Sequence, residues 1–158
     1  QVDRFMFKLL VKYPDKASER LVLRQNTTPS DFSKLKDVVS PKEILDAQNV
    51  IQDIYVDEKV EDYVLKLIFA TRDPQDHNLN DLEGIIDFGA SPRATINLVR
   101  AAKARAFTER RGYITPEDIR YVGADVLRHR VILTYEAEAE ELTADDIIQR
   151  LFEVIEVP

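Results

Sequence analysis

The chain has 158 residues, 44% hydrophobic and 32% charged, which is enough for one small domain with a buried core. It has four glycines and no cysteine, which excludes a collagen-like chain, a disulfide framework and a thiol nucleophile, and which favours a cytoplasmic location. Its net charge of -7 argues against a general nucleic-acid binder. That surplus lies entirely in residues 135–158, because residues 1–134 are charge-balanced. No run approaches the ~20 apolar residues of a membrane span.

The first residues predict one strand and one helix. Apolar side chains alternate with other residues over Phe5–Val11, which indicates a strand. Asp15 is placed to cap a helix that runs to about Gln25. A lone strand has no partner nearby, so this pair is expected to belong to a larger sheet. Residues 26–39 are typical of a connector. The predicted domains are residues 1–30 and 31–158.

The remaining chain predicts a small helical bundle. Its helices are expected to begin with side-chain caps, several of them followed by Pro at the first helical position. Two short β-type runs, Ile85–Phe88 and Val131–Thr134, are expected to pair as a ribbon. The predicted fold is therefore mostly α, a bundle with a two-stranded ribbon, preceded by one strand and one helix from an αβα core. The predicted caps are Ser40, Asp57, Ser91, Thr115 and Thr143.

Several kinds of active site are not predicted. The glycines are too scattered for a phosphate-binding GxxxxGK[ST] loop. His77 and His129 lie far apart without metal-ligand spacing, so no metal site is expected. His77 is expected to be a solvated loop residue, and His129 a helix-end cation or a packing residue. We expect no self-contained catalytic site.

Arg93 is the first candidate binding residue. With Ser91 as the cap, Arg93 is the second residue of its helix, where a cation opposes the helix dipole. A helix N-terminus also presents free N–H groups to anions, and a guanidinium suits phosphate oxygens. The pattern therefore indicates a phosphate-binding point. The alternative is a surface arginine paired with a nearby carboxylate.

Arg4 is the second candidate. It directly precedes the predicted strand and follows Asp3. The alternative is a surface pair between Asp3 and Arg4 at a strand end.

The predicted helix Thr115–Leu127 follows a short link and could be taken for a DNA-reading helix. Its exposed face is expected to carry Glu117, Asp118 and Asp125, with Arg120 as the one internal cation. Acidic side chains repel phosphates, so DNA reading is not favoured.

Four segments taken together resemble the C-terminal part of the MoxR family of AAA+ ATPases, in the same order along the chain. The segments are QVDRF with Tyr13-Pro14, GASPRA at 89–94, YITPEDI at 113–119 and VLRHR at 126–130.

The resemblance implies that residues 1–30 close an αβα nucleotide-binding core and that residues 31–158 form the AAA+ lid. Arg4 then matches the arginine finger that reaches a neighbouring subunit, and Arg93 matches the sensor 2 arginine. It further implies ATP and Mg²⁺ in the parent protein, a hexameric ring, and chaperone-like remodelling or maturation of protein complexes, often beside a von Willebrand A-type partner. Walker A and B are missing from this chain, so it is not expected to be catalytic alone.

Two alternatives remain. One is a stand-alone helical interaction module whose acidic tail docks a basic partner. The other is the corresponding part of a related ring ATPase, such as a magnesium chelatase or a replicative helicase.

Overall fold

The computed structural model describes residues 1–27 and 36–158, and the predicted domain boundary between residues 30 and 31 lies outside them. Within the described residues the chain is mostly helical with one two-stranded antiparallel ribbon, which confirms the predicted fold class. The helices are α1 (Lys16–Thr27), α2 (Pro41–Gln52), α3 (Glu58–Ala70), α4 (Pro92–Thr108), α5 (Pro116–Leu127), α6 (Tyr135–Ala139) and α7 (Ala144–Val154), and the strands are β1 (Ile86–Phe88) and β2 (Ile132–Leu133). Three short 3-10 helices, η1 (Val2–Arg4), η2 (Pro74–His77) and η3 (Asn80–Leu82), complete the described elements.

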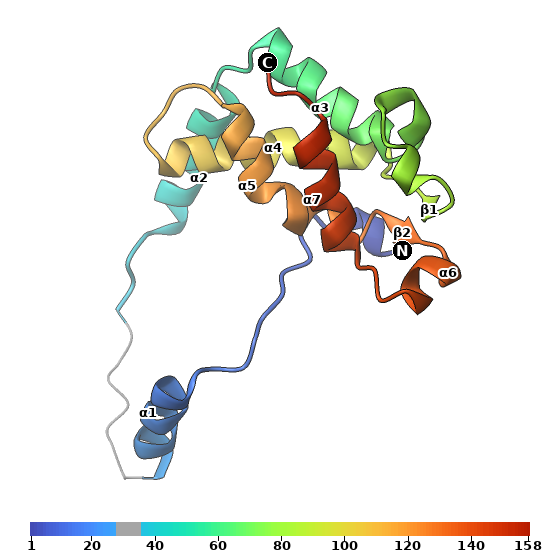
Figure 1. Ribbon diagram of the computed structural model, residues 1–158. Coiled ribbons are helices and arrows are strands. Elements are labelled where there is room, and N and C mark those ends of the chain that lie inside the picture. The colour runs from blue at the N-terminus through green and yellow to red at the C-terminus, as the bar shows by residue number, and fades with distance from the viewer. Residues whose placement is uncertain (28–35) are drawn as a thin grey trace.

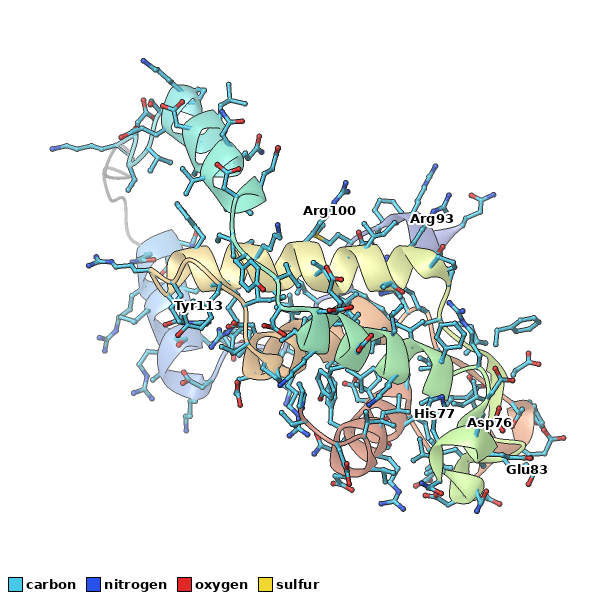
Figure 2. The ribbon with its side chains drawn as sticks, turned by 90° about the horizontal axis from the view of Figure 1, so that it is seen from above. Asp76, His77, Glu83, Arg93, Arg100 and Tyr113 are labelled. Carbon is cyan, nitrogen blue, oxygen red and sulfur yellow. The ribbon has the colours of Figure 1, made fainter. Side chains whose placement is uncertain are left out.

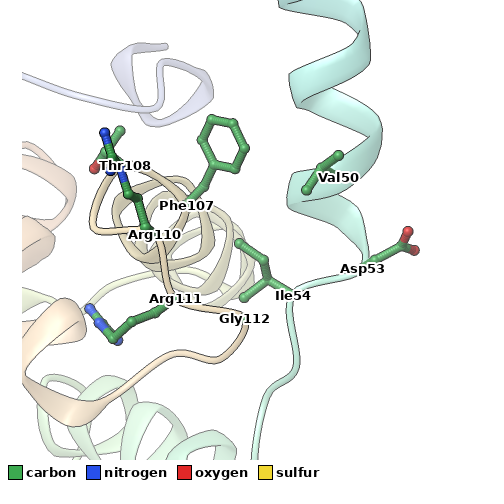
Figure 3. Close-up of a pocket in the computed structure, with 8 residues that line it drawn as sticks. All are labelled: Val50, Asp53, Ile54, Phe107, Thr108, Arg110, Arg111 and Gly112. Atoms are coloured by element: carbon green, nitrogen blue, oxygen red, sulfur yellow. The ribbon is translucent and has the colours of Figure 1, made fainter.

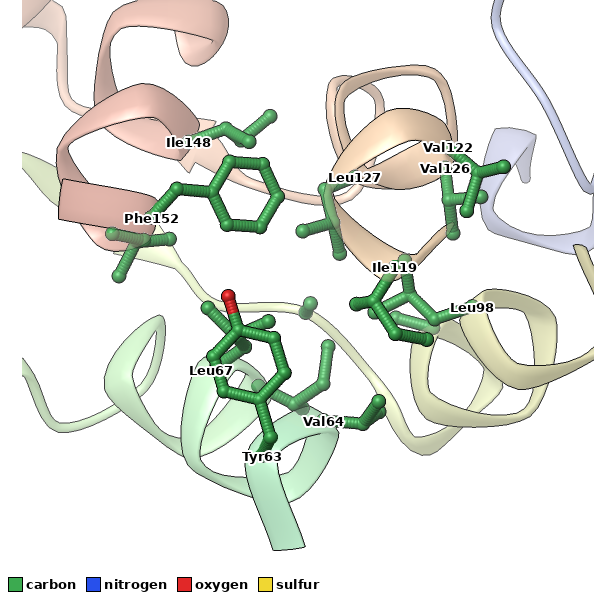
Figure 4. Close-up of a cluster of buried hydrophobic side chains, with 14 of the residues drawn as sticks. Tyr63, Val64, Leu67, Leu98, Ile119, Val122, Val126, Leu127, Ile148 and Phe152 are labelled. Carbon is green, nitrogen blue, oxygen red and sulfur yellow. The ribbon is translucent and has the colours of Figure 1, made fainter. Parts of the chain in front are cut away.

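The core lies between α3, α4, α5 and α7 (Figure 1). Its apolar side chains come from one face of each helix, at the spacing that an amphipathic helix requires. Figure 4 shows them meeting in one cluster: Tyr63, Val64 and Leu67 of α3, Leu98 of α4, Ile119, Val122, Val126 and Leu127 of α5, and Ile148 and Phe152 of α7. The most extensive helix contact is between α4 and α5.

The caps predicted for the helix starts are confirmed. The Ser40 and Thr143 side chains form capping boxes with Glu43 and Asp146, and Asp57 accepts from the backbone N–H of Lys59 at 2.9 Å. Capping needs only neighbouring residues, so it is visible in the sequence. The five-residue α6 was not predicted; it is capped by Thr134 and begins directly after β2.

The predicted ribbon also forms. Ile86 pairs with Leu133 in an antiparallel register, and the backbone N–H of Thr134 donates to the carbonyl of Ile85 at 2.9 Å. The ribbon joins the segment before α4 to the segment after α5.

The strand predicted over Phe5–Val11 is wrong for this structure. Residues 2–4 form η1, residues 5–6 form a bend, and residues 7–15 have no regular secondary structure and no strand partner among the described residues. An extended segment becomes a strand only when a neighbouring strand takes its hydrogen bonds. The predicted helix after it is confirmed as α1, with the N–H of Ser18 donating to Asp15 at 2.7 Å. Figure 1 shows α1 apart from the bundle, and it buries no residue.

The sequence pattern predicts Asp118 on the exposed face of α5. The structure corrects this prediction, because Asp118 is buried. Its carboxylate is buried at the turn between α4 and α5, where the two terminal guanidinium nitrogens of Arg111 donate to it at 2.6 and 2.8 Å. The N–H of Thr115 donates to the same carboxylate at 2.8 Å. Burial raises the pKa of Asp118, but the hydrogen bonds and charge of Arg111 outweigh it and lower the pKa below its ordinary value. This buried ion pair fixes the α4–α5 turn.

Gly123 of α5 lies directly against the Phe152 ring of α7. A Cβ at this position would overlap the ring of Phe152. We expect Gly123→Ala to lower the free energy of unfolding by about 1–3 kcal/mol, because an extra methyl in a packed core displaces its neighbours. Gly112→Ala is the matched control, since no heavy atom lies within 4 Å of its Cβ position, and it should change stability by less than about 0.5 kcal/mol. Equal urea midpoints for the two variants would contradict this packing.

Candidate functional site

The start of α4 is held against the end of α3. A Cβ on Gly89 would come within 2.5 Å of the Thr71 carbonyl oxygen, so this approach requires glycine. The N–H of Ala90 then donates to Thr71 Oγ1 at 2.9 Å, and Arg72 Nε donates to the Ala90 carbonyl at 2.8 Å. The GASPRA segment is thus built so that the N-terminus of α4 has a fixed position.

Arg93 is the second residue of α4, as predicted. Ser91 caps the helix by accepting from the backbone N–H of Arg93. The Arg93 guanidinium donates through one nitrogen to the Asp3 carboxylate at 3.2 Å, and its side chain remains 65% exposed. Figure 2 shows Arg93 on the same side of α4 as Arg100, two turns further along. Arg93 is therefore paired with a carboxylate, as the alternative interpretation of the sequence predicted. Its other guanidinium nitrogens make no hydrogen bond within the described chain, and the side chain is exposed.

Asp3 connects the N-terminal segment to α4. Its carboxylate accepts from the Ser91 hydroxyl at 3.0 Å, from Arg93 and from Arg130 Nε at 3.0 Å. Partial burial raises the pKa of Asp3, but the hydrogen bonds from Ser91, Arg93 and Arg130 together lower it below its ordinary value. The carboxylate is thus kept ionised at the N-terminus of a helix, where negative charge is favourable.

Arg130 is the anchor of this arrangement. Its side chain is 0% exposed, and each of its five N–H groups has an acceptor. Besides the Asp3 carboxylate, the acceptors are the backbone carbonyls of Asp3, Phe5, Met6 and Val126. Burial lowers the pKa of Arg130, while the hydrogen bond and charge of Asp3 oppose that shift. The guanidinium therefore holds the backbone on both sides of Arg4.

The two residues before Arg130 bind the same segment. His129 Nε2 lies 3.0 Å from the Phe5 carbonyl, and Arg128 donates to the Lys8 carbonyl at 2.6 Å. His129 is buried rather than a solvated helix-end cation, so of the two roles expected for it the structure shows packing. Its pKa is lowered because burial disfavours the imidazolium. VLRHR and QVDRF, more than a hundred residues apart, therefore bind each other directly.

Arg4 is exposed, and its side chain makes no hydrogen bond or ion pair with the described part of the chain. Its guanidinium lies 5.4 Å from the centre of the Phe5 ring. The surface pair that was the alternative for Arg4 does not form, because the Asp3 carboxylate is used by Ser91, Arg93 and Arg130. Arg4 is thus the sequence neighbour of the residue whose carboxylate binds Arg93.

A hollow of about 650 Å³ lies between the end of α2 and the end of α4, with Val50, Ile54 and Phe107 among its lining (Figure 3). Its Arg111 is already bound to Asp118. Over residues 1–27 and 36–158 no cluster of His, Asp or Glu is suited to a metal ion. No helix of this part of the chain has the length and apolar content to cross a membrane.

The sequence pattern singles out Arg93 and Arg4 as candidates but not Asp3 and Arg130, which contact Arg93 or the backbone beside Arg4. Arg93 was detectable because it breaks a local rule at a helix start. Asp3 and Arg130 lie in quoted motifs, yet their pairing depends on a contact between residues 127 apart in the sequence.

Comparison with known proteins identifies the class. Residues 82–151 match the family profile described as the AAA lid domain. A solved structure of a candidate ATPase from Cytophaga hutchinsonii superposes with a TM-score of 0.94 at 41% identity, covering 99% of this chain and 48% of that one. The fold is therefore that of an AAA+ lid with the segment that precedes it.

Curated relatives are similar to the chain over nearly all of its residues. The chaperone MoxR1 of Mycobacterium tuberculosis is 37% identical over all of this chain and 41% of its own length. The MoxR protein of Methylorubrum extorquens is 31% identical over 99% of this chain and 49% of its own length. Over its whole length the chain is thus similar to MoxR-family proteins, and residues 82–151 match the AAA lid domain. It spans about two fifths to one half of the length of these curated relatives.

His129 gives a pH-dependent stability that can be measured in this chain. Because the folded state lowers the pKa of His129 from 6.5, folding disfavours its protonation. The free energy of unfolding should therefore fall as the pH drops from about 7.5 to about 5, by no more than about 1.4 kcal/mol per pH unit. His129→Gln, which keeps a donor for Phe5, should flatten this fall, whereas the matched control His77→Gln should retain it. Urea unfolding at each pH tests this, and the same slope in both variants would contradict it.

Proposed function

We propose that this chain is the lid and arginine-finger portion of a MoxR-type AAA+ ATPase, which couples ATP hydrolysis to chaperone-like remodelling or maturation of protein complexes. The observation that carries the proposal is the placement of Arg93. It is an exposed guanidinium at the N-terminus of a rigidly positioned helix, within a chain that is similar to MoxR-family proteins.

Arg93 has the chemistry of a nucleotide sensor. One of its nitrogens binds Asp3, so the remaining donors of the guanidinium are available to phosphate oxygens. The N-terminus of α4 adds the positive end of the helix dipole. We assign Arg93 the sensor 2 role, in which the lid responds to the nucleotide.

Arg4 has the chemistry of an arginine finger. Its side chain is exposed, while the backbone on both sides of it is held by Arg130. An arginine that reaches a neighbouring subunit can stabilise the charge that develops on the transferred phosphoryl group. We assign Arg4 this role in a ring, which we expect to be a hexamer.

The chain provides only the cationic part of a nucleotide site. Its glycines do not form a Walker A loop, so the phosphates would have to be cradled by a separate core domain. That core, rather than this chain, would hold the Mg²⁺ that supplies positive charge in phosphoryl transfer. The arm from residue 9 to α1 supports a contact with such a core, because its apolar side chains are exposed. Val11 is 92% and Tyr13 is 99% exposed, and large exposed apolar surfaces mark interaction sites. Cytoplasmic location and a von Willebrand A-type partner remain part of the proposal.

The roles of Arg4 and Arg93 can be tested in a full-length protein that carries this chain together with a Walker A core. We expect Arg4→Ala to lower ATP turnover by about 10³-fold or more, and Arg93→Ala largely to abolish it. Both side chains are exposed, so the thermal midpoint should hardly change. The measurement is steady-state phosphate release by assembled rings.

Arg100→Ala is the matched control, since it removes an exposed arginine from the same side of α4 without touching Asp3 (Figure 2). It should turn over ATP at the wild-type rate. Wild-type turnover by Arg4→Ala or by Arg93→Ala would refute the role assigned to that residue.

A further inference from the structure

The two candidate nucleotide-contacting arginines are connected through a single residue. Asp3 is the direct neighbour of Arg4, and its carboxylate binds the Arg93 guanidinium at 3.2 Å and the Ser91 cap at 3.0 Å. One carboxylate therefore connects the segment that carries Arg4 with the first turn of α4.

Arg130 makes this connection stiff. It is fully buried and uses all five of its donors, three of them on the carbonyls of Asp3, Phe5 and Met6 and one on the Asp3 carboxylate. A guanidinium is planar, so acceptors bound in its fork are held in a fixed relative geometry. The backbone on both sides of Arg4 is thus fixed to α5, and through Asp3 to α4.

We propose that Asp3 and Arg130 are positioning residues that couple Arg4 to Arg93, so that the two arginines move as one body. The inference rests on the proposed function, because it explains how the sensor role of Arg93 would be coupled to the arginine-finger role of Arg4. When Arg93 is drawn toward a nucleotide phosphate, the displacement passes through the Asp3 carboxylate to residues 3–6 and shifts Arg4. The state of the nucleotide sensed by the lid thereby sets the position of the arginine finger.

Asp3→Asn and Asp145→Asn form a matched pair of variants. Each removes one negative charge from a partly exposed carboxylate that binds an arginine of VLRHR: Asp3 binds Arg130 at 3.0 Å, and Asp145 binds Arg128 at 2.8 Å. Their exposed fractions are similar, 32% and 40%. Only Asp3 also contacts Arg93 and the Ser91 cap.

The physical coupling is tested first in the 158-residue chain, by amide hydrogen exchange. We expect Asp3→Asn to speed exchange at two places together, the Phe5 N–H that donates to Val2 and the Arg93 N–H that donates to Ser91, by about tenfold. Asp145→Asn should leave both amides at the wild-type rate. If Asp3→Asn leaves the Arg93 amide unchanged, the coupling does not exist, whatever the roles of the arginines.

The functional coupling is tested next by ATP turnover of the full-length ring. Asp3→Asn should lower turnover about tenfold, as the loss of a positioning charge pair does, while Asp145→Asn should have no effect. In the Arg93→Ala background, Asp3→Asn should cause no further loss of the residual turnover, measured with enzyme in excess, because the arginine to which Asp3 couples Arg4 is already gone. A merely structural role of Asp3 would lower turnover by the same factor in both backgrounds and would overturn the inference.

The outcomes separate the two proposals. Normal turnover in Asp3→Asn, together with loss of turnover in Arg93→Ala and Arg4→Ala, overturns the coupling and leaves the proposed function standing. Normal turnover in Arg93→Ala and Arg4→Ala overturns both, even if hydrogen exchange shows the two segments to be connected.

Discussion

The structure of the site depends on the burial of one charge, the guanidinium of Arg130. A buried cation is tolerated only when it is paired and every donor is satisfied, because otherwise its desolvation is uncompensated. Here the satisfying groups come from Asp3, Phe5, Met6 and Val126. The short N-terminal segment has little apolar contact with the bundle, so this electrostatic requirement is what orders it. The backbone around Arg4 owes its position to it, and Arg93 is connected to it only through the shared Asp3 carboxylate.

The same carboxylate resolves a local conflict at the start of α4. A cation in the first turn opposes the helix dipole, typically by 0.3–1 kcal/mol. Asp3 supplies the anion that this helix end otherwise lacks, since the first turn of α4 contains no acidic residue. It binds Arg93 and the Ser91 hydroxyl together, so the unfavourable cation is paired with a carboxylate at the helix start. Arg93 is retained at a position where local rules disfavour it because a distant residue compensates it.

Two parts of the chain are stabilised in different ways. The bundle of α3, α4, α5 and α7 has a continuous apolar core and buried ion pairs such as Arg111–Asp118. The arm from residue 9 to α1 buries none of its residues, and its apolar side chains face solvent. In the full-length protein that we propose, this arm would gain its partners from the nucleotide-binding core. The bundle can therefore move as a unit, while the arm is where it would be joined to the rest of the protein.

The sequence by itself determined the features whose causes are local. The caps at Ser40, Asp57 and Thr143, the apolar helix faces and the irregular placement of Arg93 all depend on residues within a few positions, so they could be predicted. Tertiary structure decided the rest. Phe5–Val11 alternates like a strand but is not one here, because pairing requires a neighbouring strand. Asp118 has the pattern of a surface acid but is buried, because Arg111 folds back onto it. Asp3 and Arg130 meet across 127 residues, and a contact at that separation leaves no periodic or capping signal in the chain.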